Sequence, residues 1–339
     1  MNGMKVSVII PNYNGKHFIK GCVESLQKQT FEDFEIIIVD NASSDGSVEY
    51  IREQYPFVRL IEMETNTGFD GAVNAGIYAS KAPYVFLLNN DTECESTCIE
   101  ELYHAIKKSK KIFSVASCMI QFHNKELMDS AGDLYTVVGW AFNRGNGKPV
   151  KQYEKQERIF TACAGAAIYR KSIFEEIGYF DEKFFAYRED IDIGYRARIH
   201  GYYNVYCPEA KVYHLGSGTS GSKHNPFKVR LGVRNNVYLN YKNMPLPFLI
   251  LNSPFLLAGY LAKGVYFTKK HLGKDYFLGI KEAFATLKTI EKEPFQWKYL
   301  GNHFVIQLEL YINTWKIIRE KIKRNKLRDQ RMDRKDEVK

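Results

Sequence analysis

The chain has 339 residues with an apolar share of 45%, and no long stretch is dominated by Gly, Pro, Ser or Gln. This composition excludes a disordered or low-complexity protein, and the length predicts one large α/β domain with a smaller appendage. The formal net charge of +9 indicates an anionic partner. Charge alone does not distinguish nucleic acid, an anionic membrane surface and a phosphate-bearing substrate.

The six cysteines are scattered along the chain without a CxxC pair, and no signal peptide follows Met1. This pattern indicates a reduced, cytoplasmic compartment. We interpret the cysteines as small core residues, because no second Cys/His pair has the spacing of a zinc site.

The first ninety residues alternate between strand-like and helix-like segments. Short β-branched or aromatic runs predict strands at residues 5–11, 34–40, 58–62 and 84–88. Helix-length segments separate them at residues 16–29, 47–54 and 71–79. The alternation predicts a parallel sheet with crossover helices, and the nearly continuous apolar runs indicate strands that are buried on both faces.

The pattern loosens after about residue 120. We expect loops on the substrate side at residues 132–157, a strand at 159–169, a helix at 189–200 and a strand at 211–213. From residue 228 onward the pattern is helical.

Polar residues follow three of the predicted strands. Asn12, Tyr13 and Asn14 follow the first strand, Asp40 ends the second, and Asn89-Asn90-Asp91 follows the fourth. Ligands of open α/β sheets bind beyond the carboxyl ends of the strands, so these residues are the first candidates for a site. The GxGxxG of a dinucleotide-binding fold is missing after the first strand.

Two further segments complete a recognisable series: NTGFDGAVNAG at residues 66–76 and FDEKFFAYREDID at residues 180–192. In this order the segments resemble family 2 glycosyltransferases of the GT-A fold, particularly the rhamnosyltransferase-like branch of bacterial polysaccharide biosynthesis, over about residues 5–214. The resemblance implies an α/β GT-A nucleotide-binding domain at residues 1–225 with a mostly parallel central sheet. Its nucleotide-sugar half would span residues 1–120 and its acceptor half residues 121–225, followed by a helical C-terminal region at residues 226–339.

By this resemblance, a set of strand-end and loop residues binds the nucleotide sugar: Pro11, Asn12, Tyr13, Asp40, Asn66, Gly68, Asn74, Asn89, Asn90 and Arg234. Asp40 can only accept hydrogen bonds when ionised, which suits base N–H groups and ribose hydroxyls, although a helix cap is the alternative. Asp70 departs from the small residue expected at its place. It either contacts the donor sugar or begins the helix.

The Asn89-Asn90-Asp91 segment stands where the family has an Asp-x-Asp metal motif. One carboxylate together with diphosphate oxygens suffices to hold Mg²⁺ or Mn²⁺, so Asp91 is the expected ligand. His214 matches a metal-binding histidine of some members, with a structural histidine as the alternative. The loop after it, residues 215–221, is expected to fold over the diphosphate, and Arg234 to pair with phosphate oxygens.

Inverting sugar transfer needs a carboxylate that removes the proton of the acceptor hydroxyl. The resemblance assigns this role to Asp190, with Glu189 orienting it or binding the acceptor. Gly165, Ala166 and Asp192 are the expected acceptor-binding residues. The alternatives are simple strand packing for the small residues and an ion pair with Arg196 for Asp192.

The expected activity is transfer of a sugar from a UDP- or dTDP-sugar to a hydroxyl of a glycan or lipid-linked acceptor in cell-surface polysaccharide synthesis. One alternative is a catalytically inactive glycan-binding scaffold, which the retained Asp40, Asp91 and Asp190 disfavour. Another is a sugar nucleotidyltransferase, which would need a Gly-rich basic loop after the first strand. No nucleic-acid partner is expected, and a homodimer is compatible with the sequence.

Residues 243–262 carry no charge and are rich in Leu and Phe. Three prolines, two asparagines and a serine in this stretch disfavour a membrane-spanning helix. Basic residues follow, at Lys263, Lys269, Lys270 and in the tail after Lys316. We therefore predict an interfacial segment that holds the protein peripherally at the cytoplasmic face of the cell membrane. The alternative is a helical hairpin packed on the catalytic domain or on a dimer partner.

Overall fold

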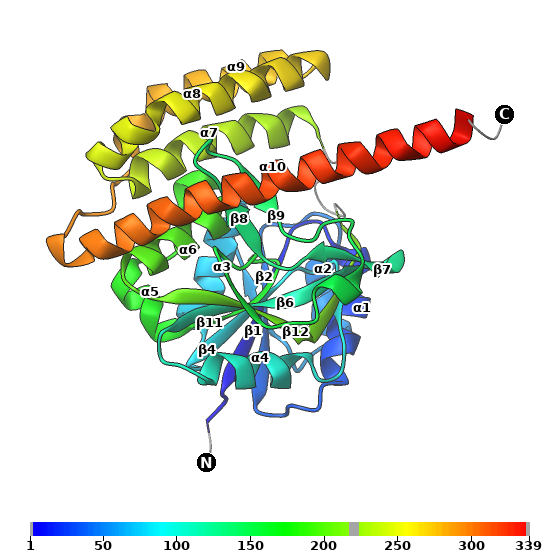
Figure 1. Cartoon of the computed structure of the whole chain (residues 1–339). Helices are drawn as coiled ribbons and strands as arrows, with labels where there is room; N and C mark the ends of the chain where they lie inside the picture. Colours follow the sequence, from blue (N-terminus) through cyan, green and yellow to red (C-terminus); the bar gives the residue numbers. More distant parts are fainter. Residues whose placement is uncertain (1–2, 217–223, 337–339) are drawn as a thin grey trace.

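The computed structural model describes residues 3–216 and 224–336, with side chains as far as residue 322. It contains an α/β sheet domain with a layer of long helices stacked on one side (Figure 1). The predicted strands of the first half are present as β1 (Val6–Asn12), β2 (Phe34–Asp40), β3 (Arg59–Glu62) and β4 (Tyr84–Leu88). They lie parallel in the order β4-β1-β2-β3.

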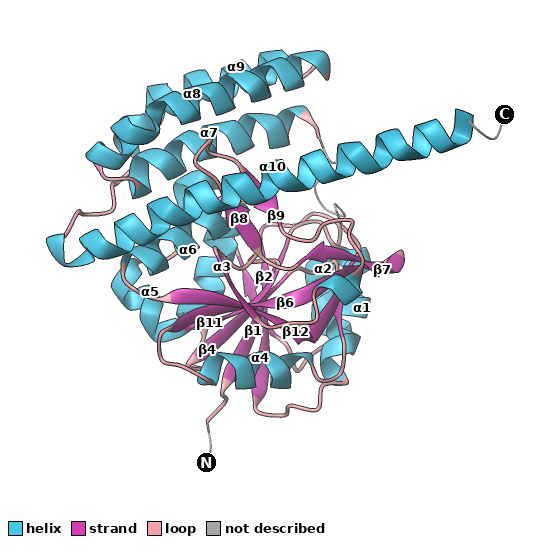
Figure 2. Ribbon diagram, in the orientation of Figure 1, coloured by secondary structure: helices cyan, strands magenta, loops and turns pink. Residues whose placement is uncertain are grey.

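Helices cover both faces of this sheet (Figure 2). One face carries α1 (Lys16–Gln27), α2 (Ser47–Gln54) and α4 (Cys98–Lys107). The other carries α3 (Gly68–Ala79), α5 (Lys171–Ile177) and α6 (Glu189–Ile199). Consecutive strand residues alternate between the two cores, which explains why the strands read as continuous apolar runs.

The second half extends the sheet with β6 (Ile112–Gln121), β11 (Ala166–Arg170) and β12 (Tyr203–His214). β11 runs antiparallel between β4 and β6, whereas β12 lies parallel to β6. Three short strands pair antiparallel at the margins: β5 (Thr92–Cys94) and β10 (Glu157–Ile159) with β12, and β7 (Asn124–Ser130) with β6.

Two predictions for this half were wrong. The apolar run at residues 159–169 is not one strand, because β10 ends at Ile159 and β11 begins at Ala166. A turn rich in small residues joins the two strands, and such residues leave the apolar pattern of the sequence unbroken. Residues 132–157 are not only loop, since they include a hairpin of β8 (Asp133–Tyr135) and β9 (Ala141–Asn143).

The C-terminal region is helical as predicted. It comprises α7 (Pro226–Asn243), α8 (Leu246–Lys269), α9 (Gly273–Thr286) and α10 (Leu300–Asp336). The start of α7 coincides with the predicted boundary: Asn225 caps the helix by accepting a hydrogen bond from Lys228 N at 2.9 Å, and Pro226 occupies the first turn. Short 3₁₀ turns lie at Val150–Gln152, Glu182–Phe184, Leu287–Thr289 and Trp297–Tyr299.

The prolines do not interrupt α8, which is one continuous helix of 24 residues. Pro245 precedes the helix and Pro247 lies in its first turn, where no backbone donor is needed, while Pro254 is tolerated inside. Within the described residues, α8 is the one helix whose length and composition would allow it to cross a membrane.

Buried polar contacts join the helical region to the sheet domain. Lys242 Nζ donates to Asp181 at 2.6 Å, and the Asn243 amide donates to Asp192 at 2.7 Å. From α10, which crosses the domain in Figure 1, the Asn313 amide donates to the carbonyl of Tyr135 at 3.0 Å. The helical region is therefore packed directly on the sheet domain.

Candidate active site

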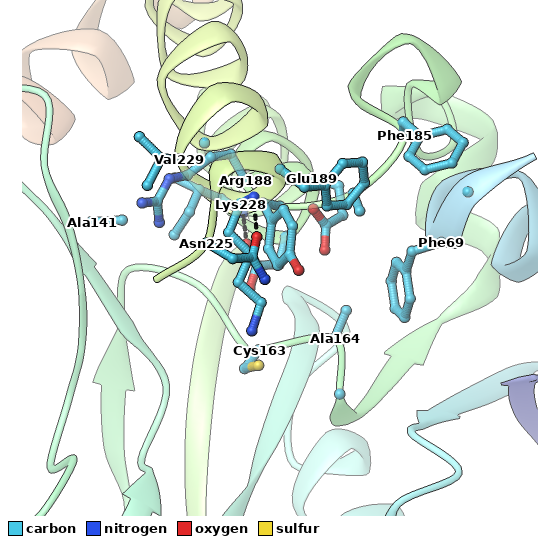
Figure 3. A pocket seen from close by; sticks show the side chains of 18 of the residues that line it. Phe69, Ala141, Cys163, Ala164, Phe185, Arg188, Glu189, Asn225, Lys228 and Val229 are labelled. Atoms are coloured by element: carbon cyan, nitrogen blue, oxygen red, sulfur yellow. Dashed lines mark hydrogen bonds between the residues drawn. The ribbon is translucent and has the colours of Figure 1, made fainter. Parts of the chain in front are cut away.

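A cavity of about 1110 Å³ lies where the carboxyl ends of the strands meet α7 and α8. Small-molecule sites usually occupy roughly 300–1,000 Å³, so this cavity has room for two substrates side by side. Figure 3 shows Phe69 and Phe185 on one side of it and Arg188, Val229 and Ala141 on the other, with Cys163 and Ala164 at its base.

Three strand ends are linked by a chain of buried side chains. The side-chain amide of Asn12 donates to Asp40 at 2.8 Å, and the side-chain oxygen Oδ1 of Asn12 accepts from the Asn90 amide at 2.7 Å. The second Asp40 oxygen accepts from Ser43 N at 2.9 Å. Asn12 and Asn90 line the cavity together with Pro11, Tyr13 and Asn89, whereas Asp40 lies behind Asn12. The carboxylate therefore orients Asn12 from below.

Asn41 fixes the neighbouring loop and was not singled out in the sequence. Its amide donates to Asn66 at 3.0 Å and to the Gly68 carbonyl at 2.8 Å, and its oxygen accepts from Thr67 N at 2.9 Å. Asn41, Asn66 and Gly68 all line the cavity. The signal for Asn41 was its place one residue after Asp40 at a strand end.

The segment between the 3₁₀ turn at Glu182–Phe184 and α6 has a strained backbone. Phe185, Tyr187 and Arg188 have φ values of 67°, 70° and 78°, a region that residues with side chains rarely adopt. Asn235 of α7 holds this segment by donating to the carbonyls of Phe184, Ala186 and Tyr187 at 2.8 Å each. Strain that is maintained by such a clamp is typical of functional sites.

Arg234, expected on the phosphates, is placed elsewhere. Its guanidinium donates to the carbonyls of Lys183 and Phe184 at 3.1 and 2.9 Å, and the residue does not line the cavity. Arg188, Lys228 and Lys263 line the cavity. None of the three was singled out as a site residue from the sequence, although Arg188 lies within the segment at residues 180–192.

Three carboxyl groups meet at the start of α6. Glu189 and Asp190 begin the helix, and Asp133 reaches the same place from β8. Burial and the charge of Asp190 raise the pKa of Glu189 to about 8. Burial also raises the pKa of Asp190, and burial together with the contact to Asp190 raises the pKa of Asp133 well above its usual value. Burial and mutual repulsion thus favour protonated forms among these carboxyl groups, and Asp133 and Asp190 titrate as a coupled pair.

Cys163 lies beside this pair, and ligand atoms of Asp133, Cys163 and Asp190 fall within 4.8 Å of one another. Burial and the two neighbouring carboxylates raise the pKa of the Cys163 thiol well above its usual value. Because metals bind the thiolate, a thiol that is kept protonated is a poor ligand. We interpret this cluster as a proton-holding group and not as the metal site.

Asp91 and His214 fit a metal ion better. Asp91 Oδ1 and His214 Nε2 lie 3.3 Å apart at the cavity wall. Neighbouring ligands of an octahedral ion with bonds of about 2.1 Å are about 3 Å apart. The other ring nitrogen, Nδ1, lies 2.7 Å from Asp129, the arrangement in which a second carboxylate orients a histidine ligand.

Without an ion, these carboxylates act on the imidazole itself. Burial alone would lower the pKa of His214, but its contacts with Asp129 and Asp91 outweigh burial and raise that pKa to about 10. An ion that binds Nε2 must therefore displace a proton. The adjoining loop expected to fold over the diphosphate lies mostly outside the described residues, since 217–223 are not described.

Besides Asp40 and Arg234, three of the expected residues lie outside the cavity. Asn74 bonds with Phe180, donating to its carbonyl at 2.9 Å and accepting from its amide at 3.1 Å. Ala166 is buried in β11, while Gly165 beside it does line the cavity. Asp192 accepts from Arg196 Nε at 3.0 Å, so the structure has the ion-pair alternative. Burial alone would raise the pKa of Asp192, but Arg196 and Lys242 hold it below its usual value.

Asp70 lies in the first turn of α3 and is fully buried. Both carboxyl oxygens lack a hydrogen-bond partner among the described residues. Burial and the nearby carboxylates, Glu189 foremost, raise the pKa of Asp70 well above its usual value. Asp70 does not line the cavity and lies in the first turn of α3, which agrees with the helix-start alternative.

Comparison with known proteins agrees with this geometry. The model of glycosyl transferase family 2 matches residues 7–178, about half of the 339 residues. The chain is 26% identical over 237 residues to the N-acetylglucosaminyl-diphospho-decaprenol L-rhamnosyltransferase of Mycobacterium tuberculosis, covering 63% of this chain and 77% of that protein.

Two solved structures show the same fold at low identity. The mannosyltransferase PcManGT from Pyrobaculum calidifontis, in complex with GDP-Man and Mn²⁺, has a TM-score of 0.53 at 15% identity, covering 84% of this chain and 88% of that one. GalNAc-T7 with UDP, GalNAc and Mn²⁺ has a TM-score of 0.56 at 18% identity, covering 70% of this chain and 48% of that one. The fold is thus that of GT-A glycosyltransferases, and the chain belongs to glycosyl transferase family 2.

Proposed function

We propose that the protein transfers a sugar, with inversion, from a UDP- or dTDP-sugar to a hydroxyl of a glycan or lipid-linked acceptor in cell-surface polysaccharide synthesis. The observation that carries this proposal is the presence of two chemically different groups in one cavity. The first group is Asp91 and His214, which lie at the ends of β4 and β12. The second is Asp190, at the start of α6. The first group suits a diphosphate with its ion, and the second suits proton removal.

Asp190 acts as the general base in this proposal. Its raised pKa keeps it basic enough to take a proton from the acceptor hydroxyl as that oxygen attacks the anomeric carbon. Oδ1 accepts a hydrogen bond from Ile191 N at 2.7 Å, and Thr161 Oγ1 donates to the Asp190 carbonyl at 2.6 Å. These bonds fix the position of the carboxylate, and Glu189 beside it would bind an acceptor hydroxyl.

The donor would lie along the strand ends. Pro11, Asn12, Tyr13, Asn66, Gly68, Asn89 and Asn90 would form its nucleotide and sugar site, since all of them line the cavity. Asp91 and His214 would hold Mg²⁺ or Mn²⁺, which neutralises charge on the departing diphosphate. Asp40 would act through Asn12, which it orients.

We also propose attachment to the cytoplasmic face of the cell membrane through α8. Leu257, Leu261 and Val265, spaced four residues apart, are 60%, 60% and 58% exposed. Lys269 and Lys270 end the helix. An exposed apolar stripe that ends in cations suits shallow insertion into an anionic leaflet.

Release of nucleotide diphosphate from a panel of UDP-, dTDP- and GDP-sugars, with and without Mg²⁺ or Mn²⁺, tests the enzymatic proposal. We expect release from at least one donor in the presence of an ion. Binding of glycans without turnover of any donor would favour the inactive scaffold.

A further inference from the structure

The cavity extends beyond the donor and base region toward the helical layer. Val229 and Val233 of α7, Phe267 of α8 and Tyr276 of α9 line this extension. Val229, Val233 and Tyr276 belong to one buried apolar cluster, with Phe267 packed against it. Sugars and nucleotides present many polar groups, whereas an apolar surface binds apolar groups. This wall therefore does not suit the sugar or the nucleotide.

Cations lie at the border between this apolar wall and the carboxylates. Arg188 and Lys263 both line the cavity, and neither forms an ion pair with any residue in the described ranges. Lys263 Nζ lies 5.4 Å from the ring centroid of Trp140, and Lys228 of α7 adds a further positive charge to the wall. Burial and the charge of Arg188 lower the pKa of Lys263 to about 7.

Neighbouring cations in a partly buried site repel each other, and each loses hydration. A bound anion would offset both costs. The donor diphosphate is already assigned to Asp91 and His214. Arg188 instead precedes Asp190 by two residues and acts electrostatically on its carboxylate. An anion at Arg188 and Lys263 would therefore belong to the acceptor, whose hydroxyl Asp190 must reach.

Helix α8 connects this place to an apolar surface. Tyr260, Lys263 and Phe267 recur at helical spacing and face the cavity. Leu257, Leu261 and Val265 lie on another side of the same helix and are exposed. A chain that leaves the cavity beside α8 would pass from one apolar environment to another.

We propose that Arg188 and Lys263 bind the phosphate or diphosphate of a lipid-linked acceptor sugar, and that the lipid chain lies along Val229, Val233, Phe267 and Tyr276. This inference rests on the proposed function and names the acceptor class for the same site.

Calorimetry with the full chain tests this subsite directly, with farnesyl diphosphate as the probe below its micelle concentration. Excess chelator removes diphosphate binding through an ion at Asp91. We expect binding by the unchanged protein and by Lys263→Arg. Lys263→Met should weaken it by about tenfold or more, because a charge-assisted contact is lost. Lys281→Met, at an exposed lysine of the neighbouring helix α9, is the matched control and should bind like the unchanged protein.

Two further probes separate the sources of the affinity. Inorganic pyrophosphate and farnesol should each bind more weakly than farnesyl diphosphate. Equal binding of pyrophosphate would overturn the lipid part of the proposal, and equal binding of farnesol would overturn the anion part. Unchanged affinity in Lys263→Met would overturn the role of Lys263. Donor turnover is measured separately: its absence counts against the proposed function, whereas turnover without farnesyl diphosphate binding counts against the subsite alone.

Discussion

Gly68 lies directly beneath the carbonyl oxygen of Phe185. The backbone amide that follows, Phe69 N, donates to this oxygen at 2.7 Å, and a Cβ on Gly68 would stand 2.2 Å from it. Gly68 also has a φ of +77°. The loop at residues 66–68 and the strained segment at residues 185–188 thus touch through a position that only glycine fills without displacement.

Replacing Gly68 by Ala should therefore lower stability and activity together. A β-carbon strains φ and pushes against the backbone of Phe185, at a cost of about 1–3 kcal/mol in the free energy of unfolding. Thermal unfolding measures the first effect and donor turnover the second. Gly301→Ala in α10, where an added Cβ meets nothing within 4 Å, is the control and should be neutral or stabilising. Equal melting of the two variants would contradict the close approach.

Asp190→Asn should abolish transfer while nucleotide-sugar binding persists. The amide keeps the shape of the side chain but cannot accept the proton, so we expect a loss of roughly 10²-fold or more in kcat. Steady-state transfer and calorimetric donor binding measure the two effects. Near-normal turnover would remove Asp190 from the role of base.

Activity should rise with pH through the range in which Asp190 loses its proton. The pKa of Glu189 is raised to about 8 and that of Asp190 is also raised, so the basic form grows as pH increases toward these values. In Asp133→Ala, the hydrogen bond that lowers the pKa of Asp190 is lost. The rising limb of the kcat/KM profile should therefore move to higher pH. A profile that stays in place would show that Asp133 does not act on Asp190.

A further prediction distinguishes the expected metal ligands Asp91 and His214 from Asp129, which orients His214. Activity should require a divalent cation, and Asp91→Ala should weaken Mn²⁺ and nucleotide diphosphate binding most. His214→Ala should show a smaller defect of the same kind. Asp129→Asn should weaken Mn²⁺ binding by roughly 10-fold, because the imidazole loses the carboxylate that orients it. Mn²⁺ titration followed by electron paramagnetic resonance measures all three. Full activity in excess chelator would refute the metal assignment, and an unchanged His214→Ala would make this histidine structural.

Membrane attachment is testable without truncation, which would uncover the buried contacts of α7 and α10. The triple variant Leu257→Ser, Leu261→Ser, Val265→Ser should float less with anionic liposomes than the unchanged protein, because the apolar stripe is removed. Phe57→Ser, at a 55% exposed residue of the sheet domain, is the control. Equal flotation of the triple variant and the control would exclude α8 as the attachment surface.

The sequence predicted the first ninety residues well, because strands buried on both faces appear as short, nearly continuous apolar runs separated by helix-length segments. It predicted β2, α2 and β4 at their observed bounds. The chemical groups at strand ends were found for the same reason, since the ends of parallel strands meet at one edge.

The acceptor side was less predictable. Asp133 of the β8–β9 hairpin and Lys263 of α8 line the cavity, and Asp129 of the edge strand β7 contacts His214. No local sequence pattern relates these three residues to Asp190 or His214. Arg188 lines the cavity, whereas Arg234 donates to the carbonyl of Phe184. The sequence does not distinguish these two arginines, because the direction of a side chain depends on tertiary packing.

Asn252 of α8 and Gln307 of α10 exchange two hydrogen bonds at 2.8 and 2.7 Å, and Asn252 is fully buried. An amide in the first third of a largely apolar helix is costly to transfer into hydrocarbon when it leaves its partner behind. The pair therefore favours α8 packed on α10 over α8 alone in a bilayer. A helix with the length of a membrane span is thus held against the rest of the protein, while its side at Leu257, Leu261 and Val265 stays exposed.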